Sequence, residues 1–268
     1  MKKFIKENSF YLKTIILIFV SNAIIYFGIK LFINNYNLVN IPLDDKIPFI
    51  KEFIYIYMIW YPFLIFNYYI IYKTNKEKYI KLVLATITSL IMLYIFFILY
   101  PSKVIRPDIN SYNDLTTFIL YIVYKVDSPT NCFPSGHCLL CFTLIYSLLD
   151  NQTISNKLKM PALIINILII MSTLFVKQHV ILDVISAFAL ATINYYFTVN
   201  LKFFNVNCSC VCTGCPNQAA TTYSGLAVLS AQRCKSSSSF SGCGCRTRRI
   251  YGLRSCCRLI PLGACSVT

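Results

Sequence analysis

The sequence predicts an all-α, polytopic membrane protein built as a bundle of six transmembrane helices. Hydrophobic residues make up 57% of the chain and charged residues 13%, whereas soluble domains average about 45–50% and about 25%. Six apolar stretches reach or approach the roughly 20 residues that a helix needs to cross a bilayer. We expect these spans at 12–33, 52–72, 82–100, 137–150, 160–177 and 180–203. The fourth span is short, so we expect its ends to be polar or shielded from lipid.

Lysines gather at alternate ends of the predicted spans and indicate their orientation. They are Lys2, Lys3, Lys6 and Lys13, then Lys73, Lys76, Lys78 and Lys81, and finally Lys157 and Lys159. Because positively charged flanks stay in the cytoplasm, we expect both termini to be cytoplasmic. Segments 34–51 and 101–136 and the turn at 177–179 then lie on the extracytoplasmic side.

The net charge of +15 does not indicate a nucleic-acid partner. Residues 1–204 carry eighteen Lys or Arg against ten Asp or Glu, and most of these lysines flank the spans. The partner that this pattern predicts is the lipid bilayer, with the protein integral to the cell (plasma) membrane. Richness in Lys, Ile and Asn indicates an AT-rich genome and hence a bacterium. The sequence leaves the oligomeric state open.

The composition changes at about residue 205, which divides the chain into a membrane domain, 1–204, and a tail, 205–268. The tail holds ten of the thirteen cysteines and no Asp or Glu. No apolar periodicity predicts a packed domain there. Four of its cysteines have a spacing that zinc accepts: Cys208, Cys210, Cys212 and Cys215. The irregular remainder favours a disordered tail, or a segment foreign to the gene such as a frameshift.

His179 and Asp183 form the first of three polar groupings that stand out in this apolar chain. Four residues apart on a helix they share a face, so the carboxylate can accept a hydrogen bond from one imidazole nitrogen. This bond fixes the tautomer and makes the other nitrogen more basic, as a nucleophile requires. The alternative is a polar pair that satisfies itself at a helix start. Ionisable residues near membrane spans favour the functional interpretation.

The run Pro134, Ser135, Gly136 and His137 is the second grouping and begins the fourth span. Proline suits a first helical turn, and glycine lets backbone amides approach an anion closely. Free N–H groups at a helix start, with the Ser135 hydroxyl, can bind phosphate. His137 could then protonate a leaving oxygen as a general acid. An ordinary turn and helix cap would explain the other three residues but not the histidine.

Arg106, followed by Pro107, is the third grouping, with Lys103 three residues earlier. The arginine fork suits phosphate oxygens. The alternative is a pair of cations that snorkel at the membrane edge. The topology places Arg106, His137 and His179 on one extracytoplasmic face, and we expect the active site there.

In order and spacing the three groupings resemble the signature of the type 2 phosphatidic acid phosphatase superfamily, a family of membrane lipid phosphatases. The third part of the signature includes Ser172, seven residues before His179. The resemblance covers roughly residues 10–203 and implies a six-helix fold. It implies that His179 is the phosphoryl-accepting nucleophile, that Asp183 orients it, and that His137 is the acid. Phosphate binding then falls to Arg106, Ser135, Gly136 and Ser172, and neither a metal nor a cofactor is expected.

Two cationic ligands of this signature are absent from their usual places. Leu99 stands where the family usually has a lysine, and Thr173 where it usually has an arginine. Lys103 and Lys177 are the predicted replacements, because each lies close to its motif on the same side of the membrane. The departures also resemble the branch related to inositol phosphorylceramide synthases, in which the phosphoryl acceptor can be an alcohol.

Three functions fit these residues. The first is hydrolysis of a lipid phosphate or diphosphate through a phosphohistidine. The second is a lipid phosphotransferase that passes the phosphoryl headgroup to an alcohol. The third is a non-catalytic lipid-phosphate binder or transporter, favoured only by the missing cations. Binding alone does not require a nucleophile with an oriented tautomer, so we expect an enzyme whose partner is a membrane lipid phosphate.

The first prediction concerns the tail. A chain that ends at Phe204 is expected to retain full activity, because all three groupings precede that residue. Phosphate release from lipid phosphates, measured for the shortened and full-length proteins in the same detergent, checks this. A shortened protein that folds but releases no phosphate would show that the tail takes part in activity.

Overall fold

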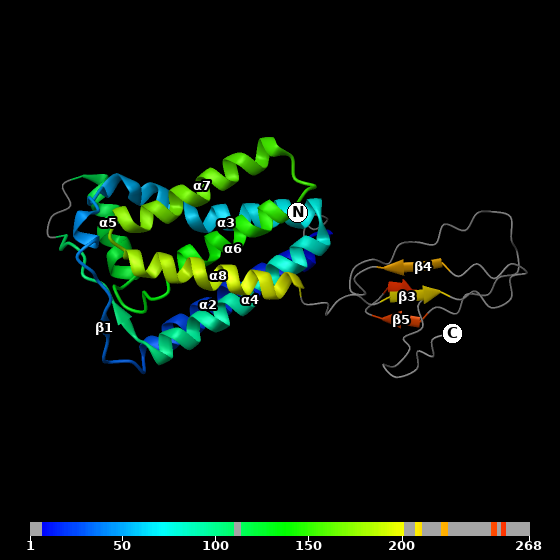
Figure 1. The fold of residues 1–268 in the computed structure, drawn as a ribbon, viewed down its shortest axis with the longest axis horizontal. Coiled ribbons are helices and arrows are strands. Elements are labelled where there is room, and N and C mark those ends of the chain that lie inside the picture. Colours follow the sequence, from blue (N-terminus) through cyan, green and yellow to red (C-terminus); the bar gives the residue numbers. More distant parts are fainter. Residues whose placement is uncertain are drawn as a thin grey trace, which may run out of the picture. The chain divides into compact units, whose positions relative to one another are not determined.

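The computed structural model describes residues 7–109 and 114–200, together with the backbone of four short strands in the tail. It divides into two compact units, 1–200 and 201–268, and each is described by itself. The first unit is helical (Figure 1). Its α-helices are α2 (Ser9–Lys30), α3 (Ile54–Thr74), α4 (Lys76–Leu99), α5 (Leu115–Val126), α6 (Gly136–Asp150), α7 (Asn156–Phe175) and α8 (Ile181–Asn200).

Six of these helices run along the long axis of the bundle and coincide with the six predicted spans (Figure 1). Five are long and apolar enough to cross a membrane, and only α6 falls short. Its 15 residues extend roughly 22 Å, against about 30 Å of hydrocarbon core. The apolar helices agree with the expected membrane protein.

Helix α6 is the best-shielded helix of the bundle, packed against α4, α7 and α8. Cys138, Leu139, Cys141 and Leu144 on this helix are completely buried. Helix α2, by contrast, leaves Ile16, Leu17, Ile24 and Phe27 more than half exposed, as expected of a helix that faces lipid. The short predicted span is therefore enclosed by protein, as its length required.

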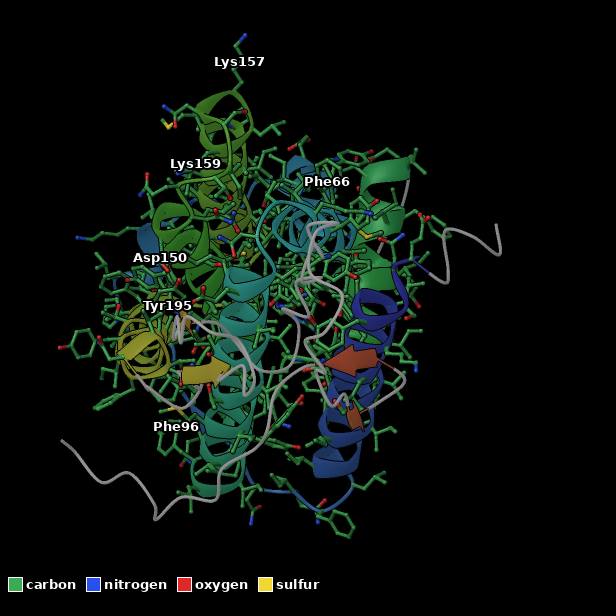
Figure 2. The ribbon with its side chains drawn as sticks, turned by 90° about the vertical axis from the view of Figure 1, so that its right-hand side faces the viewer. Phe66, Phe96, Asp150, Lys157, Lys159 and Tyr195 are labelled. Carbon is green, nitrogen blue, oxygen red and sulfur yellow. The ribbon has the colours of Figure 1, made fainter. Side chains whose placement is uncertain are left out.

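One end of the bundle carries the predicted cytoplasmic lysines of the turns between α3 and α4 and between α6 and α7, whereas Lys2, Lys3 and Lys6 fall outside the described residues. Figure 2 views this end, with Lys157 projecting outward from α7. Lys78 donates to Asp150 Oδ2 at 2.5 Å and the Tyr195 hydroxyl donates to the same oxygen at 3.3 Å. This cluster joins α4, the end of α6 and α8.

Loops from three parts of the chain close the opposite end. The short strand β1 (Asn37–Leu38) pairs in parallel with β2 (Ser102–Lys103), and Lys103 also bridges to Thr130. The Ser102 hydroxyl accepts hydrogen bonds from the backbone amides of Cys132 and Phe133. These contacts hold the segments before α3, after α4 and before α6 against one another.

Segment 40–51, on the predicted outer side, contains the 3-10 turn η1 (Asp44–Lys46) and the first residue of a second 3-10 turn, η2 (Lys51–Phe53). Asp44 is buried and accepts hydrogen bonds from two backbone amides, one nearby and one distant in the sequence. Its Oδ1 accepts from the amide of Ile181 at 2.9 Å and its Oδ2 accepts from that of Ile41 at 2.8 Å. The segment therefore anchors the start of α8.

The tail contains the strands β3 (Asn207–Cys210), β4 (Thr221–Ser224), β5 (Arg248–Ile250) and β6 (Leu253–Ser255). They form two antiparallel pairs, β3 with β4 and β5 with β6. Cys208 and Cys210 lie in β3, whereas Cys212 and Cys215 fall outside the described residues. Most of the predicted disordered tail also falls outside them, so that prediction stays open.

Asp44→Ala is expected to destabilise the fold by about 1–2 kcal/mol, because the amides of Ile41 and Ile181 lose their acceptor. Thermal unfolding in detergent measures the loss. Its neighbour Asp45 is exposed, so Asp45→Ala serves as the matched control. Equal unfolding temperatures for the two variants would contradict the anchoring role of Asp44.

Candidate functional site

The turn between α7 and α8 places His179 by a well-defined set of backbone hydrogen bonds. The amide of Gln178 donates to the carbonyl of Thr173 at 3.0 Å, and that of Lys177 donates to Leu174 at 3.1 Å. This double pattern is the Schellman motif, whose turning residue adopts a left-handed conformation and is usually glycine. Here the residue is Lys177, with φ of 54°. A left-handed non-glycine residue costs roughly 1–2 kcal/mol, so other contacts must hold the turn.

The side chain of Lys177 supplies such contacts. Its Nζ donates to the carbonyls of Asp44 at 2.8 Å and Ile47 at 2.6 Å. The lysine thus fastens the turn to segment 40–51 and is directed at this backbone. Lys177 does not line the cavity described below, so its predicted role as a phosphate ligand finds no support in this geometry.

His179 and Asp183 lie together as their spacing predicted. His179 Nδ1 lies 3.1 Å from Asp183 Oδ2, which also accepts from the amide of Val180 at 3.2 Å. His179 is 7% exposed and Asp183 is fully buried. With Nδ1–H donated to the carboxylate, the lone pair of Nε2 is available for attack. Asp183 Oδ1 has no hydrogen-bond partner in the described part of the chain.

His137 stands in the first turn of α6, close to His179. The centroids of the two imidazole rings are 5.6 Å apart. His137 also packs on two aromatic rings. The centroid of its imidazole lies 4.2 Å from that of Trp60 and 4.8 Å from that of Tyr57. Ser135 caps α6 by accepting from the amide of Cys138, and its own amide donates to the carbonyl of Asp183 at 3.2 Å. The cap thus joins α6 to α8 beside the histidine pair.

A cavity of about 480 Å³ opens onto both histidines. Its polar end includes Asp127, Asn131, Gly136, Gln178 and the histidines, and its apolar remainder is formed by α2, α3, α4 and α5. This volume lies within the usual range for small-molecule sites, roughly 300–1,000 Å³. A ligand with one polar group and an apolar body matches this division.

Gly136 meets the cavity where α6 approaches α4. A Cβ atom at this position would lie 3.2 Å from Leu93 Cδ2, closer than ordinary packing allows. Glycine therefore permits the close approach of the two helices at the cavity.

Arg106 lies beside the polar end but is already bonded to protein acceptors. Its Nη1 donates to the carbonyl of Asp127 at 2.9 Å and to Gln178 Oε1, and its Nη2 donates to the carbonyl of Tyr124 at 2.9 Å. Burial lowers the pKa of the guanidinium, although nearby Tyr124 and Asp127 oppose the shift. An arginine remains charged under such conditions. Arg106 therefore joins the end of α5 to the α7–α8 turn.

Asp127, just after α5, lines the cavity, and the sequence analysis missed it. The hydroxyl of Tyr26 donates to Oδ1 at 2.9 Å, and that of Tyr57 donates to Oδ2 at 2.7 Å. Burial raises the pKa of this carboxyl, but the nearby imidazoles of His137 and His179 and the two hydroxyls outweigh burial and lower it. Asp127 is thus ionised at neutral pH and ties α2 and α3 to the end of α5.

The structure brings parts of all three sequence motifs together: Arg106, Ser135, Gly136, His137, His179 and Asp183. Other predicted phosphate ligands lie elsewhere. Ser172 is buried, with its hydroxyl bonded to the carbonyl of Ile169, and Lys103 is exposed on β2. Neither lines the cavity. Their predicted roles, like that of Lys177, would require the side chains to move.

Two amide side chains that the sequence analysis missed lie in the cavity wall. Asn131 and Gln178 are 4% and 2% exposed. Gln178 adjoins His179 in the sequence, which is the only signal that could have drawn attention to it. Asn131 lies in the loop before Pro134 and has no distinguishing spacing.

The described residues contain no group of three or more His, Cys, Asp or Glu side chains that could hold a metal ion. The chemistry available here is that of two imidazoles, the carboxylates of Asp127 and Asp183, and side-chain amides. Comparisons with protein-family models, with curated proteins and with solved structures gave no match.

Arg106→Lys is expected to lower the stability of the fold by about 1–3 kcal/mol, because one ammonium cannot reach acceptors on three residues. Thermal unfolding in detergent measures the change. Lys103→Ala removes an exposed cation from the same loop and should leave unfolding unchanged. Wild-type stability of Arg106→Lys would mean that the guanidinium does not join these segments.

Proposed function

We propose that the protein is an integral membrane lipid phosphatase that acts through a phosphohistidine on His179. The observation that carries the proposal is the pairing of His179 with buried Asp183 at the polar end of a largely apolar cavity. The carboxylate holds the tautomer in which Nε2 bears a lone pair and stabilises the positive charge that attack creates. The resemblance of the three motifs to the type 2 phosphatidic acid phosphatase superfamily agrees with this assignment.

The reaction proceeds in two steps. His179 Nε2 forms a bond to phosphorus while the bond from phosphorus to the lipid oxygen breaks, and protonated His137 gives its proton to that oxygen. Water then transfers a proton to His137 and attacks phosphorus, which breaks the N–P bond and releases phosphate. The 5.6 Å separation of the ring centroids lets one phosphoryl group contact both imidazoles.

The substrate is amphiphilic on this proposal. The polar end of the cavity takes the phosphoryl group, and the aromatic and aliphatic walls from α2, α3, α4 and α5 take the start of the lipid chain. The lysine distribution favours an extracytoplasmic position for this end of a six-span bundle. The enzyme would then act on the outer leaflet of the cell membrane.

A lipid phosphotransferase is the second candidate. Its support is the cavity, which is large enough for an alcohol to replace water in the second step. Product analysis separates the two reactions, because hydrolysis releases inorganic phosphate and transfer yields a new phosphate ester. A non-catalytic binder would form neither product.

His179→Ala is expected to abolish phosphate release from a panel of lipid phosphates and diphosphates. Asp183→Asn should lower the rate by orders of magnitude, about 10⁴-fold in the comparable His–Asp pair of serine proteases, because the wrong tautomer is favoured. The measurement is phosphate release by the purified protein in detergent.

Asp150→Asn is the matched control for Asp183→Asn. It replaces an aspartate by asparagine at the end of α6 that lies far from His137. It should retain wild-type turnover. If folded His179→Ala kept turnover close to wild type, His179 would not be the nucleophile.

A further inference from the structure

The described residues that line the cavity supply positive charge to a phosphate only through the imidazoles of His137 and His179. Among the described residues, no Lys or Arg lines it. The nearest guanidinium, Arg106, is bonded to acceptors on Asp127, Tyr124 and Gln178, and Lys177 is bonded to two carbonyls. An anion bound at the histidines must therefore find its further hydrogen-bond donors among neutral groups.

Gln178 offers such a donor in a fixed orientation. Its Oε1 accepts from Arg106, and a guanidinium has no acceptor, so the amide cannot be turned around. The other end, Nε2, is buried without a hydrogen-bond partner in the described part of the chain. Gln178 lines the cavity and directly precedes His179. The arginine thus holds an N–H donor beside the nucleophile.

Asn131 offers a second amide. Both Oδ1 and Nδ2 are buried and lack hydrogen-bond partners among the described residues, although the side chain lines the cavity. Its backbone is left-handed, with φ of 57°, and its backbone N–H donates to the carbonyl of Ser102 at 2.7 Å. Buried polar groups without partners are rare in native proteins, and two in one cavity wall point to a polar ligand.

We propose that the side-chain amides of Asn131 and Gln178 bind the phosphoryl oxygens and replace the missing cationic ligands. Neutral amides stabilise developing oxyanion charge in other enzymes when they are held in place beforehand. Arg106 is then a positioning residue that acts through Gln178. The inference deepens the proposed function, because it names the groups that hold the phosphoryl oxygens at the same histidine pair.

The test measures binding of inorganic phosphate to the full-length protein in detergent by isothermal titration calorimetry. Gln178→Glu keeps an acceptor for Arg106 but removes the donor, and Asn131→Gly removes the amide while tolerating the left-handed backbone. Each variant should raise the Kd about tenfold or more, as expected for a lost hydrogen bond to a charged ligand. Gln178→Met, also without a donor, replaces Gln178→Glu if the carboxylate prevents folding.

Asn151→Asp is the matched control. Asn151 is also buried with an unpartnered Nδ2, but it ends α6 at the far end from the cavity. This variant should bind phosphate as the wild type does. Thermal unfolding without phosphate confirms that each variant folds.

Two results would overturn the inference: a wild-type protein that binds no phosphate, or folded amide variants that bind it within about twofold of wild type, less than the loss of one hydrogen bond. Failure of the phosphatase proposal looks different. In that case the amide variants lose phosphate binding, but the wild type releases no phosphate from any lipid of the panel.

Discussion

The buried carboxylate of Asp183 is the group on which the arrangement of the site depends. Its Oδ2 receives His179 Nδ1 and the amide of Val180, and its backbone carbonyl receives the amide of Ser135. One residue thus caps the start of α8, orients the candidate nucleophile and holds the start of α6. Removal of the carboxylate would leave a buried amide and an imidazole without their acceptor, at a cost beyond the single contact. Asp183 therefore has a structural role at the same place as its proposed catalytic role.

The other buried polar groups at this end follow the same constraint. A loop packed against an apolar bundle must satisfy its backbone amides and carbonyls within the protein. Asp44 accepts from two amides, the Ser102 hydroxyl accepts from two more, and Arg106 and Lys177 each donate to two backbone carbonyls. These hydrogen bonds join loops that are distant in the sequence. Arg106 and Lys177, the cations near the candidate site, therefore form hydrogen bonds mainly with backbone carbonyls.

This explains which parts of the molecule the sequence could predict. Apolar length located the six long-axis helices, and the spacing of His179 and Asp183 on one helix face predicted their contact. The roles of Lys177, Asn131 and Gln178 depend on loop conformations set by partners 72 to 133 residues away or by left-handed backbone. No local pattern encodes such contacts. Proximity to a motif is therefore a poor guide to the direction in which a lysine side chain points.

Thr173 and Leu99, where the signature that this sequence resembles usually has cations, have structural surroundings of their own. Thr173 is completely buried, its hydroxyl donates to the carbonyl of Ile170, and it lies 3.6 Å from Cys138 Sγ on α6. A long arginine side chain there would have to displace α6, because interiors are close-packed. Leu99 is 77% exposed at the end of α4, as suits contact with lipid. Thr173 thus packs against α6, and Leu99 suits contact with lipid. In the proposed site, Arg106 acts on a bound phosphate indirectly, because it orients the side-chain amide of Gln178.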